Sequence, residues 1–136
     1  MKKVSIAVMI ILIVLCIVLA CGWYLSAHSG KPQKAAAQGA AKDSYEAFLS
    51  YQETGEEKYY LYAVSSFYCF EQAYREYDES EYPLTNSVYA LLVEKSEQSK
   101  ENLDVLMEAM KILSEDVTHP NGYLKLSRFK NAVGGG

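Results

Sequence analysis

The sequence predicts an all-α protein, with an N-terminal transmembrane helix followed by a small extracytoplasmic bundle of two αα-hairpins and a C-terminal helix. Three observations predict this fold class. Residues 4–25 form an uncharged apolar run at the start of a chain of 136 residues. From residue 43 onward, apolar side chains recur at the three- and four-residue spacing of amphipathic helices. That pattern then repeats, which makes the bundle resemble a helical-repeat array.

The apolar run is long enough to predict a membrane anchor. Its 22 residues would form a helix of about 33 Å, against a hydrocarbon core of about 30 Å. Lys2 and Lys3 precede the run, which predicts a cytoplasmic N-terminus at residues 1–3. Trp23 and Tyr24 would lie at the membrane interface, where amphipathic rings are stabilised. We therefore expect a single-pass cell-membrane protein, held by a transmembrane helix or uncleaved signal anchor.

A short motif within the run supports an alternative. Val18-Leu19-Ala20-Cys21 resembles the lipobox of bacterial lipoproteins, in which a small residue precedes an acylated cysteine. The resemblance implies that Cys21 carries the lipid and becomes the new N-terminus. The residues that follow, Gly22-Trp23-Tyr24-Leu25, remain apolar where a lipoprotein usually turns polar. Cleavage as an ordinary signal peptide is less favoured, because such peptides have apolar regions of only about 7–15 residues.

Composition divides the rest of the chain. Residues 26–42 consist mainly of Ala, Gly, Gln, Ser and Lys, which predicts a flexible linker. Residues 43–133 then form the extracytoplasmic helical domain, and residues 134–136 form a glycine tail.

The first predicted hairpin pairs helices near 44–53 and 56–77. Thr54 and Glu57 fit a capping box at the start of the second helix. The inner stripe of that helix has helical spacing throughout: Tyr60, Ala63, Val64, Phe67, Phe70, Tyr74 and Tyr77.

The second predicted hairpin is ambiguous in its connection. Residues 84–116 are helical in pattern, but residues 95–102 contain no apolar side chain. Either one long helix passes through, or the chain turns there with Ser99 as a new cap. The turn at residues 119–122 and the apolar residues Leu126, Phe129 and Val133 predict a last short helix.

An internal repeat favours the turn. A shift of 43 residues places Ala47-Phe48-Leu49 on Ala90-Leu91-Leu92, and the polar segment 53–58 on 96–101. Two hairpins of matching design are therefore expected, with the last helix covering an open end.

Charge and reactive side chains exclude several functions. The formal net charge is −4, and residues 43–81 hold ten acidic residues against Lys58 and Arg75, which argues against nucleic-acid binding. Histidine occurs only at positions 28 and 119, and no metal-ligand spacing or glycine-rich phosphate loop is present. The lone cysteine of the domain, Cys69, is expected to be a small buried side chain. We expect no enzyme activity, no cofactor and no metal.

Tyrosine is the unusual residue of this chain. Ten of its twelve tyrosines lie between Tyr45 and Tyr89. The first interpretation is that the helix at 56–77 is central and surrounded by others. The alternative is a tyrosine-rich binding surface, with Tyr51, Tyr59 and Tyr62 as its candidates.

The function predicted from these features is a membrane-anchored interaction or scaffolding module that binds another envelope protein through the acidic, tyrosine-rich hairpin. One alternative is a lipoprotein, acylated at Cys21, that holds a peptide or small ligand between its hairpins. A second is an accessory subunit of a membrane complex.

Overall fold

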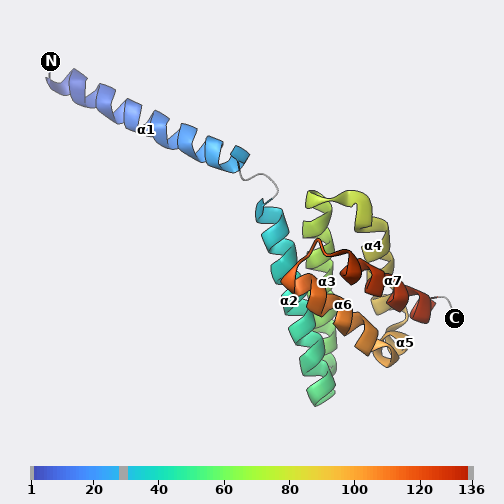
Figure 1. Ribbon diagram of the computed structural model, residues 1–136. Helices are drawn as coiled ribbons and strands as arrows, with labels where there is room; N and C mark the ends of the chain where they lie inside the picture. The colour runs from blue at the N-terminus through green and yellow to red at the C-terminus, as the bar shows by residue number, and fades with distance from the viewer. Residues whose placement is uncertain (1, 28–30, 135–136) are drawn as a thin grey trace. The chain divides into compact units, whose positions relative to one another are not determined.

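The computed structural model describes the backbone of residues 2–27 and 31–134, and within these ranges it is helical and contains no strand. The all-α prediction is therefore confirmed for this part of the chain. The chain divides into two units, Met1–Pro32 and Gln33–Gly136, each of which is described by itself. Its elements (Figure 1) are α1 Lys2–Ala27, α2 Lys31–Thr54, α3 Glu57–Tyr77, the 3-10 turn η1 Glu79–Glu81, α4 Tyr82–Glu94, α5 Ser96–Glu101, α6 Leu103–Glu115 and α7 Pro120–Gly134.

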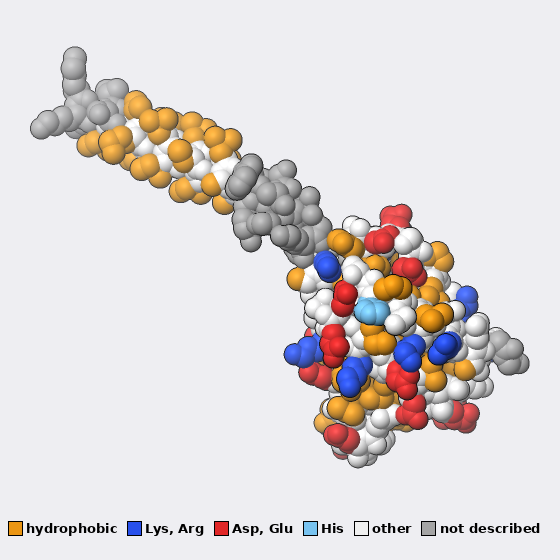
Figure 2. All heavy atoms as spheres, in the orientation of Figure 1, with side chains coloured by type: hydrophobic (Ala, Val, Ile, Leu, Met, Phe, Trp, Pro, Cys, Tyr) orange, Lys and Arg blue, Asp and Glu red, His pale blue; other side chains and the backbone are white. Residues whose placement is uncertain are grey.

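Every described side chain of α1, from Ile6 to Cys21, is apolar. Figure 2 shows hydrophobic side chains along the face of α1 that is in view. Among the described residues, however, no helix combines the length and the apolar character that crossing a bilayer requires. This finding contradicts the transmembrane helix or signal anchor predicted over residues 4–25. It also contradicts the cell-membrane localisation and topology that depended on that helix.

The segment predicted as a linker is helical over much of its length. Helix α2 begins at Lys31, and Ala37 and Ala41 are fully buried in the core of the second unit. Alanine has the highest helix propensity, and its small side chain allows neighbouring helices to approach closely. Composition alone therefore placed the start of the domain too late. Residues 28–30 lie outside the described part of the chain.

The predicted α2–α3 hairpin is present, with its turn and α3 close to the expected boundaries, whereas α2 begins thirteen residues before the predicted residue 44. Gly55 follows α2 in the left-handed region, with φ of 72°, and its N–H donates to the Tyr51 carbonyl at 2.7 Å. Glycine ends a helix in this way without a steric penalty. Thr54 Oγ1 accepts from the Glu56 N–H at 3.2 Å, but Glu57 does not complete a capping box, because its carboxylate binds Lys100 at 2.7 Å.

The second hairpin differs from the prediction. Helices α4 and α6 are separated by the short helix α5, so the chain does turn near residues 95–102. Ser99 is buried inside α5 and does not start a helix; its Oγ donates at 3.1 Å to the Leu91 carbonyl, which also accepts from the Lys95 N–H at 2.8 Å. The two halves are not matching copies, because α2 and α3 contain 24 and 21 residues whereas α4 and α6 contain 13 each.

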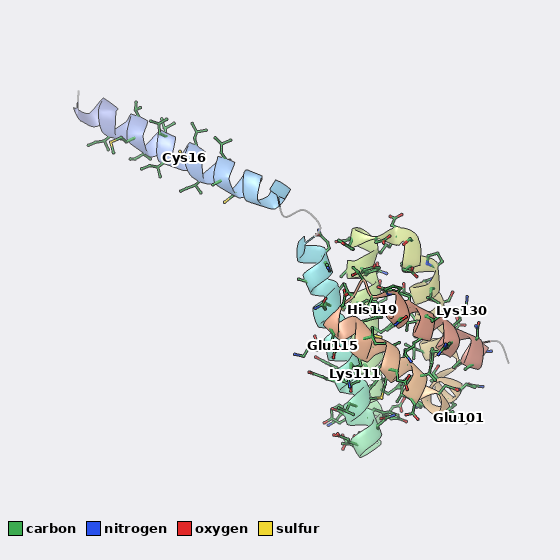
Figure 3. All side chains as sticks on the ribbon, viewed as in Figure 1. Cys16, Glu101, Lys111, Glu115, His119 and Lys130 are labelled. Carbon is green, nitrogen blue, oxygen red and sulfur yellow. The ribbon has the colours of Figure 1, made fainter. Side chains whose placement is uncertain are left out.

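Helix α7 is longer and more central than predicted. It begins at Pro120, a residue suited to a first helical turn, and His119 Nδ1 accepts from the Asn121 N–H at 3.1 Å. In Figure 3, His119 lies where α7 starts and Lys130 lies toward its end. The helix packs against both α4 and α6, so it joins the two helices that the sequence predicted to pair directly.

The five longer helices of the second unit enclose one core. Gln52 of α2 donates to Asp104 of α6 at 2.9 Å, α3 packs on α4, and α7 connects α4 to α6. The largest side chains of this core are Tyr60, Phe48, Phe67, Phe70, Phe129, Leu92, Leu106, Met110, Leu113 and Leu126. Cys69, expected to be buried, is exposed, because the inner stripe of α3 passes through Phe67 and Phe70 and leaves position 69 on the outer side.

Candidate functional site

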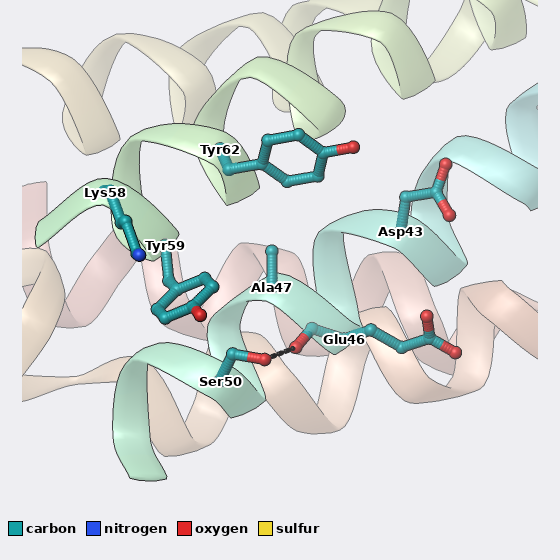
Figure 4. A pocket seen from close by; sticks show the side chains of 7 residues that line it. All are labelled: Asp43, Glu46, Ala47, Ser50, Lys58, Tyr59 and Tyr62. Atoms are coloured by element: carbon teal, nitrogen blue, oxygen red, sulfur yellow. Dashed lines mark hydrogen bonds between the residues drawn. The ribbon is translucent and has the colours of Figure 1, made fainter. Parts of the chain in front are cut away.

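A groove lies between α2 and α3 in the described part of the second unit. Its volume is about 400 Å³, and it is open to solvent along one side. We call it the tyrosine groove. Its lining residues (Figure 4) are Asp43, Glu46, Ala47 and Ser50 from α2, and Lys58, Tyr59 and Tyr62 from α3.

The helical period explains why these side chains meet. The buried stripe of α3 passes through Tyr60, Ala63 and Val64, so Tyr59 and Tyr62 fall beside it, next to α2. Position 47 of α2 carries only an alanine, which leaves room for the two rings above it. Figure 4 shows the Tyr62 ring extending from α3 toward the part of α2 that carries Asp43.

The polar groups of the groove differ in whether they already have an interaction partner within the chain. Lys58 Nζ lies 3.1 Å from Glu56 Oε2, and the hydrogen bond from this carboxylate raises the Lys58 pKa. The Ser50 hydroxyl donates to the Glu46 backbone carbonyl at 3.1 Å. No described lysine or arginine forms an ion pair with the carboxylates of Asp43 and Glu46. Within the described part of the chain, the groove therefore presents two carboxylates without a basic partner beside two aromatic rings.

The structure brings together two of the three tyrosines singled out from the sequence. Tyr59 and Tyr62 line the groove, and Tyr62 is 63% exposed. Tyr51 instead packs against Tyr60, with ring centroids 5.7 Å apart, and the Lys100 ammonium lies 5.7 Å from its ring centre. Tyr51 therefore belongs to the packing between the first hairpin and α5.

Two groove residues were not predicted from the sequence as site residues. Asp43 and Glu46 lie on one side of α2 together with Ala47 and Ser50. Their spacing of three and four residues marks one helix face, but that face could be assigned to a groove only once α3 was placed beside it. The exposed Leu61, at 59%, was also not singled out, although it lies next to Tyr62 on the exposed side of α3.

The predicted lipid and membrane residues lie in the other unit. The Cys21 side chain is exposed, and its acylation stays a prediction. The side chains of Trp23 and Tyr24 lie outside the described part of the structure, so their predicted interface role is not addressed there.

Outside the groove, the domain has a buried carboxyl group and a second hollow. Glu71 is 1% exposed, and its Oε2 has no hydrogen-bond partner, so burial raises the pKa of this carboxyl. A second hollow, of about 380 Å³, lies between α4 and α7 and is lined by Leu91, Lys130 and neighbouring residues. Among the described residues, no group of three or more His, Cys, Asp or Glu side chains is arranged to hold a metal ion.

Comparison with protein-family models, curated proteins and solved structures finds no match to this chain. The chemistry of the groove is that of a binding surface: aromatic contact area, two free carboxylates and a small, open volume. The groove lies within the first hairpin, whereas the peptide or ligand site considered from the sequence would lie between hairpins.

Proposed function

We propose that this protein is a non-catalytic protein-interaction module whose tyrosine groove binds a basic segment of another protein. The observation that carries this proposal is the pairing of two tyrosine rings with two unpaired carboxylates, those of Asp43 and Glu46, in one open groove.

Aromatic exposure supports a binding role. Tyr62 is 63% exposed and Leu61 beside it is 59% exposed, so the groove and its edge present substantial apolar area to solvent. Tyrosine is enriched at protein interfaces because it contributes a large contact area at low conformational-entropy cost. A peptide side chain entering the groove would cover one or both rings.

Charge supports a basic partner. A lysine or arginine side chain placed in the groove could contact a tyrosine ring face and reach the carboxylates of Asp43 and Glu46. Lys58 opposes such a partner only weakly, because its own charge is balanced by Glu56 at 3.1 Å. The acidic surroundings would also favour the encounter with a basic surface.

Site-specific photo-crosslinking in cells tests this proposal. A benzophenone amino acid replaces Tyr62 in the full-length chain, and a matched chain carries it in place of Leu124, an exposed residue of α7 at 52%. We expect discrete adducts to a defined protein from position 62 and none of these from position 124. The partner segment, identified by mass spectrometry of the adduct, should contain lysine or arginine at the attachment site.

Charge reversal then separates specific binding from chance contact. Asp43→Lys together with Glu46→Lys should reduce the adduct yield from position 62 at least about tenfold, because two attractions become repulsions. Glu53→Lys with Glu101→Lys, which lie on exposed positions outside the groove, makes the matched control with the same change in net charge. Equal adducts from positions 62 and 124, or adducts indifferent to the Asp43 and Glu46 reversal, would refute the proposal.

A further inference from the structure

Next to the tyrosine groove, the outer side of α3 carries a continuous uncharged surface. Leu61 is 59% exposed, Tyr62 63% and Tyr68 45%, while Ser65 and Cys69 are exposed and Gln72 is half-buried. We call these six residues the α3 face. They follow the helical spacing of three and four residues, so they lie together along the side of α3 that points away from the core.

Charged residues occur at both ends of the α3 face in a particular order. Glu57 and Lys58 precede it, and Arg75 and Glu76 follow it. Position 75 comes 18 residues after position 57, and position 76 comes 18 after position 58. Because 18 residues make about five helical turns, Glu57 and Arg75 lie in line along one flank of the face, and Lys58 and Glu76 lie in line with the face itself.

We propose that the α3 face binds the α3 face of a second copy of this chain in an antiparallel, two-fold symmetric pair. In such a pair the face and its flank each meet the same surface of the partner in reverse order. Glu57 of one copy then faces Arg75 of the other, and Lys58 faces Glu76. A parallel two-fold pair would instead place Lys58 against Lys58 and Glu76 against Glu76, which like-charge repulsion disfavours.

The uncharged residues of the face are complementary in the same register. Placing the small side chain of Ser65 opposite the exposed ring of Tyr68 also places Leu61 opposite Gln72, since Leu61 precedes Ser65 by four residues and Gln72 follows Tyr68 by four. The small residues Ser65 and Cys69 allow the two helices to approach closely, while Tyr62 and Tyr68 supply contact area. The face is therefore self-complementary in both shape and charge.

These charged residues have partners within the chain but stay exposed enough to pair across the interface as well. Lys58, whose Nζ lies 3.1 Å from Glu56, keeps a side chain that is 70% exposed. The Glu57 side chain binds Lys100 at 2.7 Å but remains 56% exposed. Arg75 lies 4.3 Å from the centre of the Tyr82 ring and is itself exposed. The 21 residues of α3 extend over about 32 Å, so the interface is at the small end of specific interfaces and its formation should depend on protein concentration.

Disulfide trapping of the full-length chain tests the pairing and its direction. In a background with Cys16, Cys21 and Cys69 replaced by alanine, one tagged chain carries Leu61→Cys and a second, of different size, carries Gln72→Cys. When both are expressed together and oxidised, we expect the mixed 61–72 disulfide to exceed either like-with-like disulfide at least about fivefold, since only the mixed pair falls within disulfide reach. A chain with Ala132→Cys, an exposed residue of α7, replaces the second chain as the matched control and should give no dimer.

Charge exchange supplies an independent variant. Lys58→Glu alone, or Glu76→Lys alone, introduced into both chains should reduce the mixed disulfide about tenfold, because two attractive pairs become repulsive. The double change Lys58→Glu with Glu76→Lys restores opposite charges and should restore the yield to within about twofold of the starting chains. A predominant 61–61 disulfide, equal yields with the α7 control, or no rescue by the double change would overturn the proposal.

This inference goes beyond the proposed groove function and can fail separately from it. If no mixed disulfide forms but adducts from position 62 contain another protein, self-association is refuted and groove binding stands. If the disulfide forms as expected but reversal at Asp43 and Glu46 leaves the adducts unchanged, the groove function is refuted and the antiparallel pair stands.

Discussion

The Tyr60 hydroxyl donates a 2.6 Å hydrogen bond to the Leu92 backbone carbonyl, across the interface between α3 and α4. Leu92 lies in the last turn of α4, where carbonyl groups have no partner within the helix. The Ser99 hydroxyl donates at 3.1 Å to the adjacent carbonyl of Leu91, which also accepts from the Lys95 N–H at 2.8 Å. The C-terminal end of α4 therefore accepts hydrogen bonds from side chains of α3 and α5, which fixes the position of both relative to it.

Tyr60→Phe should lower the free energy of unfolding by about 1–2 kcal/mol, because a buried carbonyl loses its donor while the ring is retained. Tyr62→Phe is the control, since that ring is 63% exposed and its hydroxyl can bond to water. The control should change stability by less than about 0.5 kcal/mol. Urea unfolding of the two variants measures this, and equal effects would show that the Tyr60–Leu92 bond contributes nothing specific.

Stability should fall in alkaline solution. Burial raises the pKa of Tyr60 to about 12, above its ordinary value of 10.0, and burial also raises the pKa values of Tyr74 and Tyr123. The protonated phenol is thus favoured in the folded state. Its contribution to the free energy of unfolding is complete below pH 10 and is lost as the pH rises toward 12. For Tyr60 alone the loss of unfolding free energy over that interval is about 2–3 kcal/mol. Unfolding free energies measured between pH 9 and 12 should decline less steeply in Tyr60→Phe.

The elements that could be predicted from the sequence are those whose signals are local. The boundaries of α3 follow from the three- and four-residue spacing of Tyr60, Ala63 and Phe67, and the break after α2 follows from Gly55. Prediction from composition was wrong where a segment is helical because it packs against residues distant in the sequence. Residues 31–42 resemble a linker because they lack large apolar side chains, yet Ala37 and Ala41 are fully buried in the core.

The site was predictable only in part for a similar reason. Tyrosine density identified Tyr59 and Tyr62, which line the groove, but it also selected Tyr51, which packs on Tyr60. Asp43 and Glu46 could not be assigned to the groove, because membership depends on which helix lies beside them. The transmembrane prediction rested on a run of 22 residues, whereas no described helix has both the length and the apolar character needed.

Glu71→Gln should stabilise the protein at neutral pH. The Glu71 carboxyl is 1% exposed, and its only hydrogen bond is a long one, 3.4 Å from Gln72 Nε2 to Oε1. Burial raises the pKa of Glu71, so the protonated form is favoured in the folded state and stability falls as the pH rises above the ordinary carboxyl range. Removing the buried charge should add about 1 kcal/mol at pH 7.

The control for Glu71→Gln is Glu76→Gln, an exposed position on the same helix. Thermal unfolding between pH 4 and 8 should show a flatter pH dependence in Glu71→Gln and an unaltered one in Glu76→Gln. A destabilised Glu71→Gln at pH 7 would mean that the carboxylate has a partner that the described contacts do not include.

Gly122 and Gly39 should respond oppositely to the same substitution. A Cβ at Gly122 would overlap the buried side chain of Leu113, coming within 2.7 Å of its Cγ, because α7 and α6 approach closely there. Gly122→Ala should therefore cost about 1–3 kcal/mol. Gly39 lies inside α2 with nothing within 4 Å of the position that a Cβ would take, so Gly39→Ala should add about 0.5–1 kcal/mol by helix propensity. Chemical denaturation of both variants tests the pair, and a stabilised Gly122→Ala would contradict the close approach.

Lys100 should matter more to stability than its place on the surface suggests. Its ammonium lies 2.7 Å from Glu57 and 4.8 Å from the centre of the Tyr60 ring, and the bond to Glu57 raises its pKa. Its side chain is only 15% exposed, whereas that of Lys58 is 70% exposed. Lys100→Met should cost about 1 kcal/mol, since α5 loses an ion pair and a cation–π contact with the first hairpin.

Lys58→Met is the matched control for Lys100 and should cost less than about 0.5 kcal/mol, because its pair with Glu56 is exposed on both sides. A double-mutant cycle of Lys100→Met with Glu57→Gln isolates the ion pair from the ring contact. We expect a coupling free energy of about 0.5 kcal/mol that diminishes in 1 M salt. The rest of the stability lost in Lys100→Met should persist in salt, because the contact with the Tyr60 ring is less accessible to ions. If the full cost of Lys100→Met disappears in salt, the ring contributes nothing and α5 is held by charge alone.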